Sequence, residues 1–269
     1  MSFIDFREIP VANSGKGDQD YFELFARDFF WSLGYVIDQG PSRGADGGRD
    51  LIVVEPLDGI VSRSEKRWLV SCKHFVHTGK SVLNRDEPDI AGRVRNFSCA
   101  GFIGFYSTLP SSGLANTLKL LQDNQDKIEI EIFDRARIEH FLAADDRLRT
   151  VLQRYFPEAY TRVAQNYTWE KLYTAILTLA TGQFSLQERL ADAYVSSLIR
   201  LRPEDLPRGL SDELAELGKR LTCVDPEDDE GSVYATVRAM DTETARELAA
   251  KIVSMYDRYR VNLVDDLRN

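Results

Sequence analysis

Two stretches of sequence decide the fold: Gly-Ala-Asp-Gly-Gly-Arg-Asp-Leu-Ile-Val-Val at residues 44–54 and Arg-Trp-Leu-Val-Ser-Cys-Lys at residues 67–73. Each joins an apolar run, rich in β-branched residues, to charged residues at its edge. Runs of this length and composition are typical of strands. We therefore expect two neighbouring strands that bring the Asp50 carboxylate and the Lys73 ammonium together at the mouth of a small sheet.

Helical and strand patterns alternate on both sides of these stretches. Residues 20–33 repeat apolar positions every three or four residues, which predicts an amphipathic helix that ends at Gly34. Further patterns predict strands at 35–37, 50–55, 67–73, 101–108 and 128–133, a polar hairpin-like stretch at 56–66, and helices at 86–98, 111–124 and 135–154, the last with a break near 144–146. Strict alternation over 128–133 predicts an edge strand. The order predicts an α/β domain with a central mixed sheet flanked by helices.

The C-terminal part of the chain has a different character. From about residue 160 onward, β-branched runs disappear and helical patterns dominate, at 168–181, 185–201, 211–221 and 241–260. We expect two domains, residues 1–157 and residues 158–269, of which the second is an all-α module. Its amphipathic helix faces predict a self-contained core, with an oligomerisation or partner-binding surface as the alternative.

Composition and charge narrow the class of protein. The 269 residues carry a net charge of −9, which argues against a protein that coats nucleic acid by bulk electrostatics. However, residues 40–85 hold eight Lys or Arg against five Asp or Glu, a local positive excess around Asp50 and Lys73. No apolar stretch is as long as the ~20 residues of a membrane span, and the first residues lack the basic start and apolar block of a secretory signal. The three cysteines are far apart and form no disulfide framework. We expect a cytoplasmic protein with no membrane partner.

The chemistry of the two strand ends points to phosphodiester cleavage. A carboxylate can hold a hard divalent cation, and a nearby lysine can act on water or on phosphate charge. Strand residues two apart share a face, so Ser71 and Lys73 point the same way and Cys72 points to the other side. That placement favours buried packing for Cys72 over a thiol nucleophile paired with His74. The plainer interpretation is that Asp50 is a turn or capping residue and Lys73 is only solvated.

Several motifs together resemble a known family. Glu23 on the first helix, the phrase that ends at Asp50, and the strand that ends in Ser71-Cys72-Lys73 look like the Mrr-type restriction endonuclease domain of the PD-(D/E)xK nuclease superfamily. The resemblance covers roughly residues 15–145. His74 and the Gly79-Lys-Ser-Val phrase also resemble prokaryotic anti-phage defence nucleases. The resemblance implies a restriction-endonuclease-like fold and a Mg²⁺-dependent deoxyribonuclease that acts in restriction or antiviral defence.

Carried over residue by residue, the resemblance assigns roles to the candidate site. Asp50 would be the main metal ligand, and Lys73 would act on the attacking water or stabilise charge on the phosphate. Glu23 would reach the metal directly or through water, and the backbone carbonyl of Cys72 could add a ligand. The departure is Ser71, which stands where the superfamily usually has Glu, Asp or Gln and which is a poorer ligand for Mg²⁺. We expect Mg²⁺, with Mn²⁺ as the alternative ion, and leave the number of metals open.

Other residues are candidates for supporting roles. Arg43 and Arg49 suit phosphate steering, and His74 and Lys80 are candidates for phosphate contact, although turn arginines often only face solvent. Glu87 is expected in the first turn of the helix at 86–98, as a capping residue or close to the metal.

Two further predictions concern residues near these motifs. Asp46 is expected to support Asp50 from the turn. The aromatic residues of the first helix follow helical spacing, which favours core packing over base stacking. They are Phe22, Phe25, Phe29, Phe30 and Trp31.

Three functions remain open from sequence. The first is a DNA endonuclease; because the chain is acidic and lacks a DNA-reading motif, it would need oligomerisation or a defence-system partner, through the C-terminal helices, to engage DNA. The second is a non-catalytic nucleic-acid-binding or assembly module on a decayed nuclease fold, which Ser71 favours. The third is a ribonuclease that uses the same site.

Overall fold

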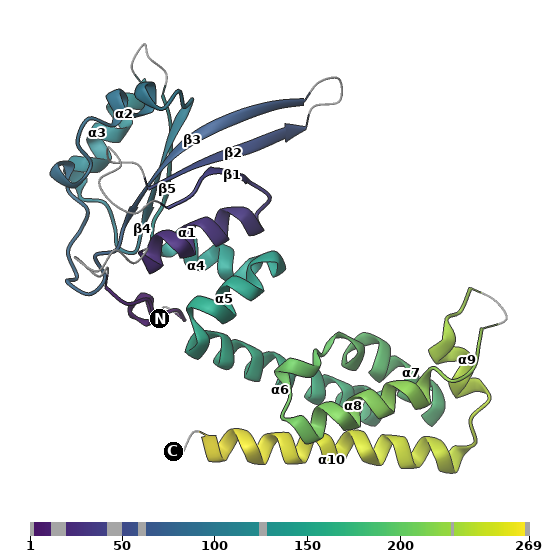
Figure 1. Cartoon of the computed structure of the whole chain (residues 1–269). Helices are drawn as coiled ribbons and strands as arrows, with labels where there is room; N and C mark the ends of the chain where they lie inside the picture. The colour runs from purple at the N-terminus through teal and green to yellow at the C-terminus, as the bar shows by residue number, and fades with distance from the viewer. Residues whose placement is uncertain are drawn as a thin grey trace. The chain divides into compact units, whose positions relative to one another are not determined.

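The structure is a computed structural model that describes residues 3–11, 20–41, 50–58, 63–123, 128–226 and 229–266. The chain divides into two compact units, Met1–Tyr160 and Thr161–Asn269 (Figure 1). The division falls inside helix α6, Pro157–Thr181. The sequence places its domain boundary at residue 157, close to the start of the same helix.

A five-stranded mixed sheet forms the centre of the first unit. Its strands lie in the order β1-β2-β3-β4-β5. They are β1 (Val36–Gln39), β2 (Leu51–Asp58), β3 (Arg63–Lys73), β4 (Gly101–Tyr106) and β5 (Glu129–Phe133). The pairs β1–β2 and β2–β3 are antiparallel, whereas β3–β4 and β4–β5 are parallel. The predicted mixed sheet is therefore confirmed, and so is the edge position of β5.

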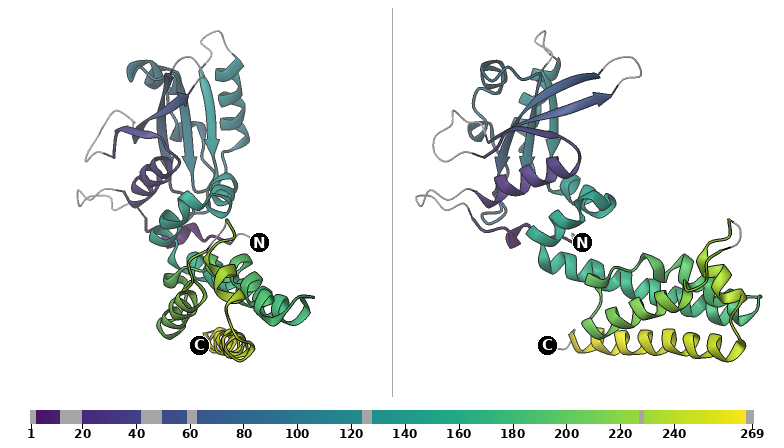
Figure 2. Two further views of the ribbon diagram at one scale, coloured as in Figure 1. Left: turned by 90° about the vertical axis from the view of Figure 1, so that its right-hand side faces the viewer. Right: turned by 45° about the vertical axis from the view of Figure 1, so that its right-hand side comes forward.

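Helices cover both faces of this sheet. The first unit contains α1 (Tyr21–Ser32), α2 (Ile90–Asn96), α3 (Ser112–Asp123), α4 (Arg135–Ala144), α5 (Arg149–Tyr155) and the short 3-10 helices η1 (Phe6–Glu8), η2 (Asn84–Asp86) and η3 (Asp146–Leu148). Figure 2 shows α1 and α3 on opposite sides of the sheet. The break predicted near residues 144–146 lies between α4 and η3.

The register of β3 and β4 determines what each face of the sheet carries. Ser71 pairs with Gly104, and Lys73 pairs with Tyr106. These residues lie on the same face of the sheet as Leu69, which belongs to the buried apolar cluster between the sheet and helices α2 and α3. Cys72 pairs with Phe105 on the opposite face. There Phe105 contacts the aromatic rings of α1. The two faces thus place Lys73 and Cys72 in different surroundings.

Helix α1 is anchored by its N-cap and by one aromatic stripe. The Asp20 carboxylate accepts a hydrogen bond of 2.7 Å from the backbone N–H of Phe22. Gly34, at φ 99°, follows the helix in a conformation that favours glycine. The side chains of Phe22, Phe25, Phe29 and Phe30 are buried, and each fully buried ring contributes about 1.5–3 kcal/mol.

Trp31 does not join this core, and the prediction that it would is wrong. The residue is 69 % exposed. Successive helical residues are rotated by about 100°, so Trp31 lies on the side of α1 opposite Phe22 and Phe29. The four phenylalanines fill the space against the sheet, which leaves the indole outside.

Two predicted element boundaries are also wrong. The hairpin expected at 56–66 is confirmed, but the strands that it joins are longer than predicted, because the antiparallel β2–β3 ladder continues from Leu51↔Val70 to Asp58↔Arg63. The helix expected at 86–98 begins only at Ile90. Pro88 explains this difference because the residue before a proline avoids helical geometry, and Glu87 has φ −127° and ψ 64°.

The second unit is helical throughout its described residues, as the sequence predicts. It contains the remainder of α6 with α7 (Leu186–Ser196), η4 (Leu198–Arg200), η5 (Pro203–Asp205), α8 (Arg208–Leu221), α9 (Ser232–Arg238) and α10 (Thr242–Asp266). Its core includes the buried side chains of Leu172, Leu190, Leu217, Leu248 and Ile252. Helix α9 was not predicted. None of the described helices is long and apolar enough to cross a membrane.

Candidate active site

Because β2 and β3 are antiparallel, Asp50 just before the start of β2 lies beside Lys73 at the end of β3. Leu51 pairs with Val70, so the start of β2 lies beside the end of β3. The backbone N–H of Cys72 donates to Asp50 Oδ2 at 2.5 Å, which orients this carboxylate. Lys73 Nζ lies 3.8 Å from the same Oδ2 atom. Both side chains are about one-fifth exposed, at 17 % and 21 %, so a ligand can reach the pair from solvent.

Ser71 holds the ammonium of Lys73. Lys73 Nζ donates a hydrogen bond of 3.0 Å to Ser71 Oγ. Ser71 is fully buried, and its strand neighbour is Gly104. A hydroxyl at position 71 therefore places Lys73 but brings no negative charge to the site.

Glu87 brings a second carboxylate to Lys73. Its side chain is fully buried, and Oε1 lies 4.0 Å from Lys73 Nζ. Oε1 also accepts a hydrogen bond of 3.1 Å from the Tyr106 hydroxyl, and Oε2 accepts one of 2.6 Å from Arg93 Nη2. Buried carboxylates need such partners, because desolvation of an isolated charge costs several kcal/mol. Asp50 and Glu87 thus face Lys73 together, and Arg93 balances the additional charge.

The contact between Glu87 and Tyr106 depends on Gly104. A Cβ atom at position 104 would collide with the phenol of Tyr106. Burial, followed by the negative charge of Glu87, raises the pKa of Tyr106, so its hydroxyl stays protonated and can donate. The sequence predicts Glu87 in the first turn of a helix. The Glu87-Pro88 pair and the glycine two residues before Tyr106 were the available signals for this different arrangement.

Cys72 lies on the opposite face of β3, where burial and the charge of Glu23 change the pKa of its thiol. Burial, then the negative charges of Asp50 and Glu23, raise the pKa of the Cys72 thiol well above its ordinary value. Two carboxylates, one from the start of β2 and one from α1, therefore act on the same thiol. Because a thiol reacts through its thiolate, this environment disfavours Cys72 as a nucleophile.

This environment predicts how the cysteines react with alkylating agents. At pH 8, iodoacetamide should modify the exposed Cys223 well before Cys72, because little of the Cys72 thiol is ionised and access to it is limited. Peptide mass spectrometry over a time course measures both rates in the folded protein. Equal rates for the two cysteines would contradict the assigned environment, and equal rates after denaturation in urea serve as the control.

His74 is held against the N-terminal segment. Its Nε2 bonds to the backbone carbonyl of Ile9 at 2.9 Å, and its ring stacks on Phe22 with centroids 4.6 Å apart. His77 Nε2 bonds to the same carbonyl at 2.8 Å. Burial lowers the pKa of His74, which favours the neutral ring. The predicted phosphate contact would have to use Nδ1, which is buried and has no hydrogen-bond partner among the described residues.

The structure gives less information on the other residues predicted to contact or support the site. Lys80 is exposed in the segment that follows β3. Arg43, Asp46 and Arg49 lie outside the described residues, so their predicted roles stay predictions.

The donor atoms at the site fit a cation that keeps most of its water. Within the described ranges, no group of three or more His, Cys, Asp or Glu side chains could hold a metal ion by itself. Magnesium usually takes only one or two carboxylates and completes its shell with water and substrate phosphate. Asp50 and Glu23 are oxygen donors of the kind that it prefers, and, in addition to burial, the charge of each raises the pKa of the Cys72 thiol. The residues present therefore fit a hydrated Mg²⁺ rather than an all-protein metal cage.

Comparisons with known proteins give one structural match. No protein-family model matches the chain, and no curated protein sequence matches it. Among solved structures, the chain is similar to the DNA modification-dependent restriction endonuclease AspBHI, at 13 % identity and a TM-score of 0.37. The match covers 50 % of this chain and 34 % of that one, so it spans about a third of the other protein's length.

Proposed function

We propose that this chain is a metal-dependent endonuclease that hydrolyses phosphodiester bonds in DNA, in restriction or anti-phage defence. The observation that carries the proposal is the approach of Lys73 Nζ to within 3.8 Å of Asp50 Oδ2 at an accessible edge of the sheet. An oriented carboxylate beside an ammonium suits the hydrolysis of a charged ester. The resemblance of the sequence around Glu23, Asp50 and Lys73 to the Mrr-type domain supports DNA as the substrate.

The side chains divide the chemistry between them. Water adds to phosphorus and one P–O ester bond breaks, which leaves a phosphate monoester and a free hydroxyl. Lys73, held by Ser71 Oγ, stabilises the negative charge that develops on the phosphate oxygens. Asp50, fixed by the Cys72 N–H, orients the groups that meet at the phosphate.

The proposed mechanism also includes a metal ion. Asp50 and Glu23, with the Cys72 backbone carbonyl, would hold Mg²⁺ or the alternative Mn²⁺. When bound, such an ion neutralises phosphate charge and lowers the pKa of a coordinated water. Glu87 is already engaged by Arg93 and Tyr106, so we assign it to the positioning of Lys73 rather than to the metal.

A cleavage assay tests the proposed activity. Purified protein should nick or linearise plasmid DNA with Mg²⁺ or Mn²⁺, and EDTA should abolish this activity. A matched RNA of the same sequence should stay intact. Cleavage of RNA alone would replace the proposal with a ribonuclease, and cleavage that persists in EDTA would contradict the metal.

A second candidate function is a non-catalytic nucleic-acid-binding or assembly module. The buried, neutral Ser71 at the usual acidic position favours it. Intact DNA at high protein concentration, together with measurable DNA binding, would select this function over the nuclease.

We further propose that the helical second unit supports assembly. A net charge of −9 disfavours strong binding of DNA by a single copy, so self-association or a defence-system partner would supply additional contacts. Light scattering coupled to size-exclusion chromatography, with and without DNA, measures the number of copies.

A further inference from the structure

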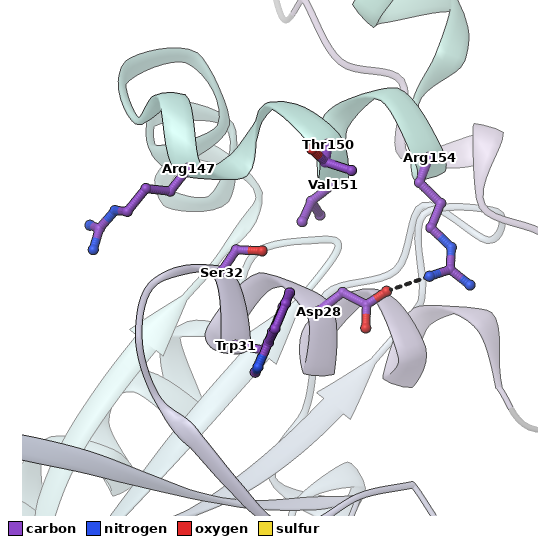
Figure 3. A pocket seen from close by; sticks show the side chains of 7 residues that line it. All are labelled: Asp28, Trp31, Ser32, Arg147, Thr150, Val151 and Arg154. Atoms are coloured by element: carbon purple, nitrogen blue, oxygen red, sulfur yellow. Dashed lines mark hydrogen bonds and ion pairs between the residues drawn. The ribbon is translucent and has the colours of Figure 1, made fainter.

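A surface pocket between α1 and the segment η3–α5 lies outside the candidate active site. Its volume is about 430 Å³, within the range of small-molecule sites. Figure 3 shows Arg147 and Arg154 at opposite ends of the pocket, with Thr150 and Val151 between them. From α1, Trp31 is the largest side chain of the wall. Trp31 is eight residues beyond Glu23, which is about 12 Å along the helix axis, so the pocket is distinct from the site at Asp50 and Lys73.

The ring of Trp31 is available to a ligand. The residue is 69 % exposed, and no aromatic ring or cation contacts its ring among the described residues. The buried Val151 adds an apolar surface on the opposing helix, and Ser32 and Thr150 contribute hydroxyl groups. A flat, exposed indole beside hydroxyl groups suits a planar ligand with polar edges.

One end of the pocket carries excess positive charge. Arg154 Nη1 donates to Asp28 Oδ2 at 2.9 Å. The same carboxylate also accepts from Arg27 Nη2 at 2.6 Å and from the Tyr155 hydroxyl at 2.7 Å. Two guanidinium groups therefore share one carboxylate, and Arg154, at 61 % side-chain exposure, presents its remaining N–H groups to solvent.

Arg147, at the other end of the pocket, is already engaged. It donates to the Asp145 carboxylate and to the backbone carbonyl of Leu33. The excess charge thus lies at the Arg154 end of a pocket that Trp31 and Val151 also line, in a chain whose net charge is −9. A ligand that fits both ends of this arrangement is aromatic on one side and anionic on the other.

We propose that this pocket binds a nucleotide, with its base stacked on Trp31 and a phosphate on Arg154. The shared chemistry is a nucleobase that carries a phosphate, whether it comes from a free mononucleotide or from single-stranded nucleic acid. Stacking of a base on an aromatic side chain is tolerant of base identity, so the pocket discriminates weakly between bases. The proposal does not rest on cleavage at Asp50 and Lys73.

Binding measurements in EDTA test this site without cleavage. Isothermal titration with AMP and dAMP, and fluorescence anisotropy with a labelled single-stranded dA oligonucleotide, give the affinities. Trp31→Ala should weaken binding by about 5- to 150-fold, the range for loss of one stacked base. Arg154→Ala should weaken binding and reduce its salt dependence, because one phosphate contact is lost.

Matched variants separate this site from general effects. Trp169→Ala removes an exposed tryptophan of the second unit, and Arg246→Ala removes an exposed arginine that is paired with Glu243. Both should bind as wild type. Trp31 and Arg154 are largely exposed, so their variants should keep the wild-type melting temperature. An Asp50→Asn variant should also retain nucleotide binding. This result is expected whether or not the wild-type protein cleaves DNA.

Mononucleotide binding that depends on Trp31 assigns a free-nucleotide site, whereas oligonucleotide binding alone, with the same dependence, assigns a single-strand contact. Wild-type affinity in both Trp31→Ala and Arg154→Ala overturns the proposal. No binding of either ligand to the wild-type protein at millimolar concentration overturns it as well.

Discussion

Replacing Lys73 by Ala is expected to reduce DNA cleavage by about 10²- to 10³-fold, the usual cost of losing one group that stabilises transition-state charge. The ammonium lies between Asp50 Oδ2 and Glu87 Oε1, and Ser71 Oγ holds it in place. No other lysine of the described residues makes an ion pair with either carboxylate. Single-turnover cleavage of plasmid DNA at saturating Mg²⁺ measures this loss.

The fold should survive this substitution. Without Lys73, Glu87 keeps its bonds to Arg93 and Tyr106, and Asp50 keeps its bond to the Cys72 N–H. A loss of activity with an unchanged melting temperature would therefore report on chemistry.

The matched control is Lys66→Ala. Lys66 lies on the same strand, and its partner Glu129 is 55 % exposed, so its removal should leave cleavage unchanged. Asp50→Asn, which preserves shape and an acceptor for Cys72, should lose activity as Lys73→Ala does. Near-wild-type rates in both Asp50→Asn and Lys73→Ala would show that the active site lies elsewhere.

Replacing Glu87 by Ala is expected to destabilise the first unit by about 3–5 kcal/mol, because it breaks a buried ion pair with Arg93. It also removes the acceptor of the Tyr106 hydroxyl. Urea unfolding measures the loss. Emission of the buried Trp68 reports on the first unit in a background of Trp31→Phe and Trp169→Phe, which removes the two exposed indoles.

Two further variants interpret this result. Glu129→Ala, which removes an exposed carboxylate bonded to Lys66, should cost no more than about 1 kcal/mol. Glu87→Gln retains the shape and one acceptor, so it should cost less than Glu87→Ala while it removes the charge beside Lys73. A loss below about 1 kcal/mol for Glu87→Ala would contradict the buried network.

Much of the fold could be predicted from the sequence because its patterns are local. The apolar runs before Lys73 and after Asp50 identified two strands, and strict alternation at 128–133 identified the edge strand β5. Trp31 was also predictable in principle, since its position on a helical wheel is opposite Phe22 and Phe29. The helical spacing of the aromatic residues predicts core packing for all five, but only the four phenylalanines share the buried face of α1.

The candidate site was only partly predictable. That Asp50 and Lys73 lie together follows from strand order and antiparallel pairing. The roles assigned to Asp50, Lys73, Glu23 and Ser71 stay predictions until the variants are measured. For Glu87 the sequence leaves a capping role and a place close to the metal both open, because its partners Arg93 from α2 and Tyr106 from β4 meet only after the sheet has formed.

The sequence by itself determined the elements, the division into an α/β part and a helical part, and the strand ends at which charge would gather. The tertiary structure alone decided that Glu87, rather than residue 71, brings a second carboxylate to Lys73. It also decided that Trp31 faces a pocket with Arg154. The physical reason is the distance in sequence over which each signal acts. Hydrophobic periodicity reports on one helix or strand, whereas these charges and rings come from different elements and meet only when the elements pack together.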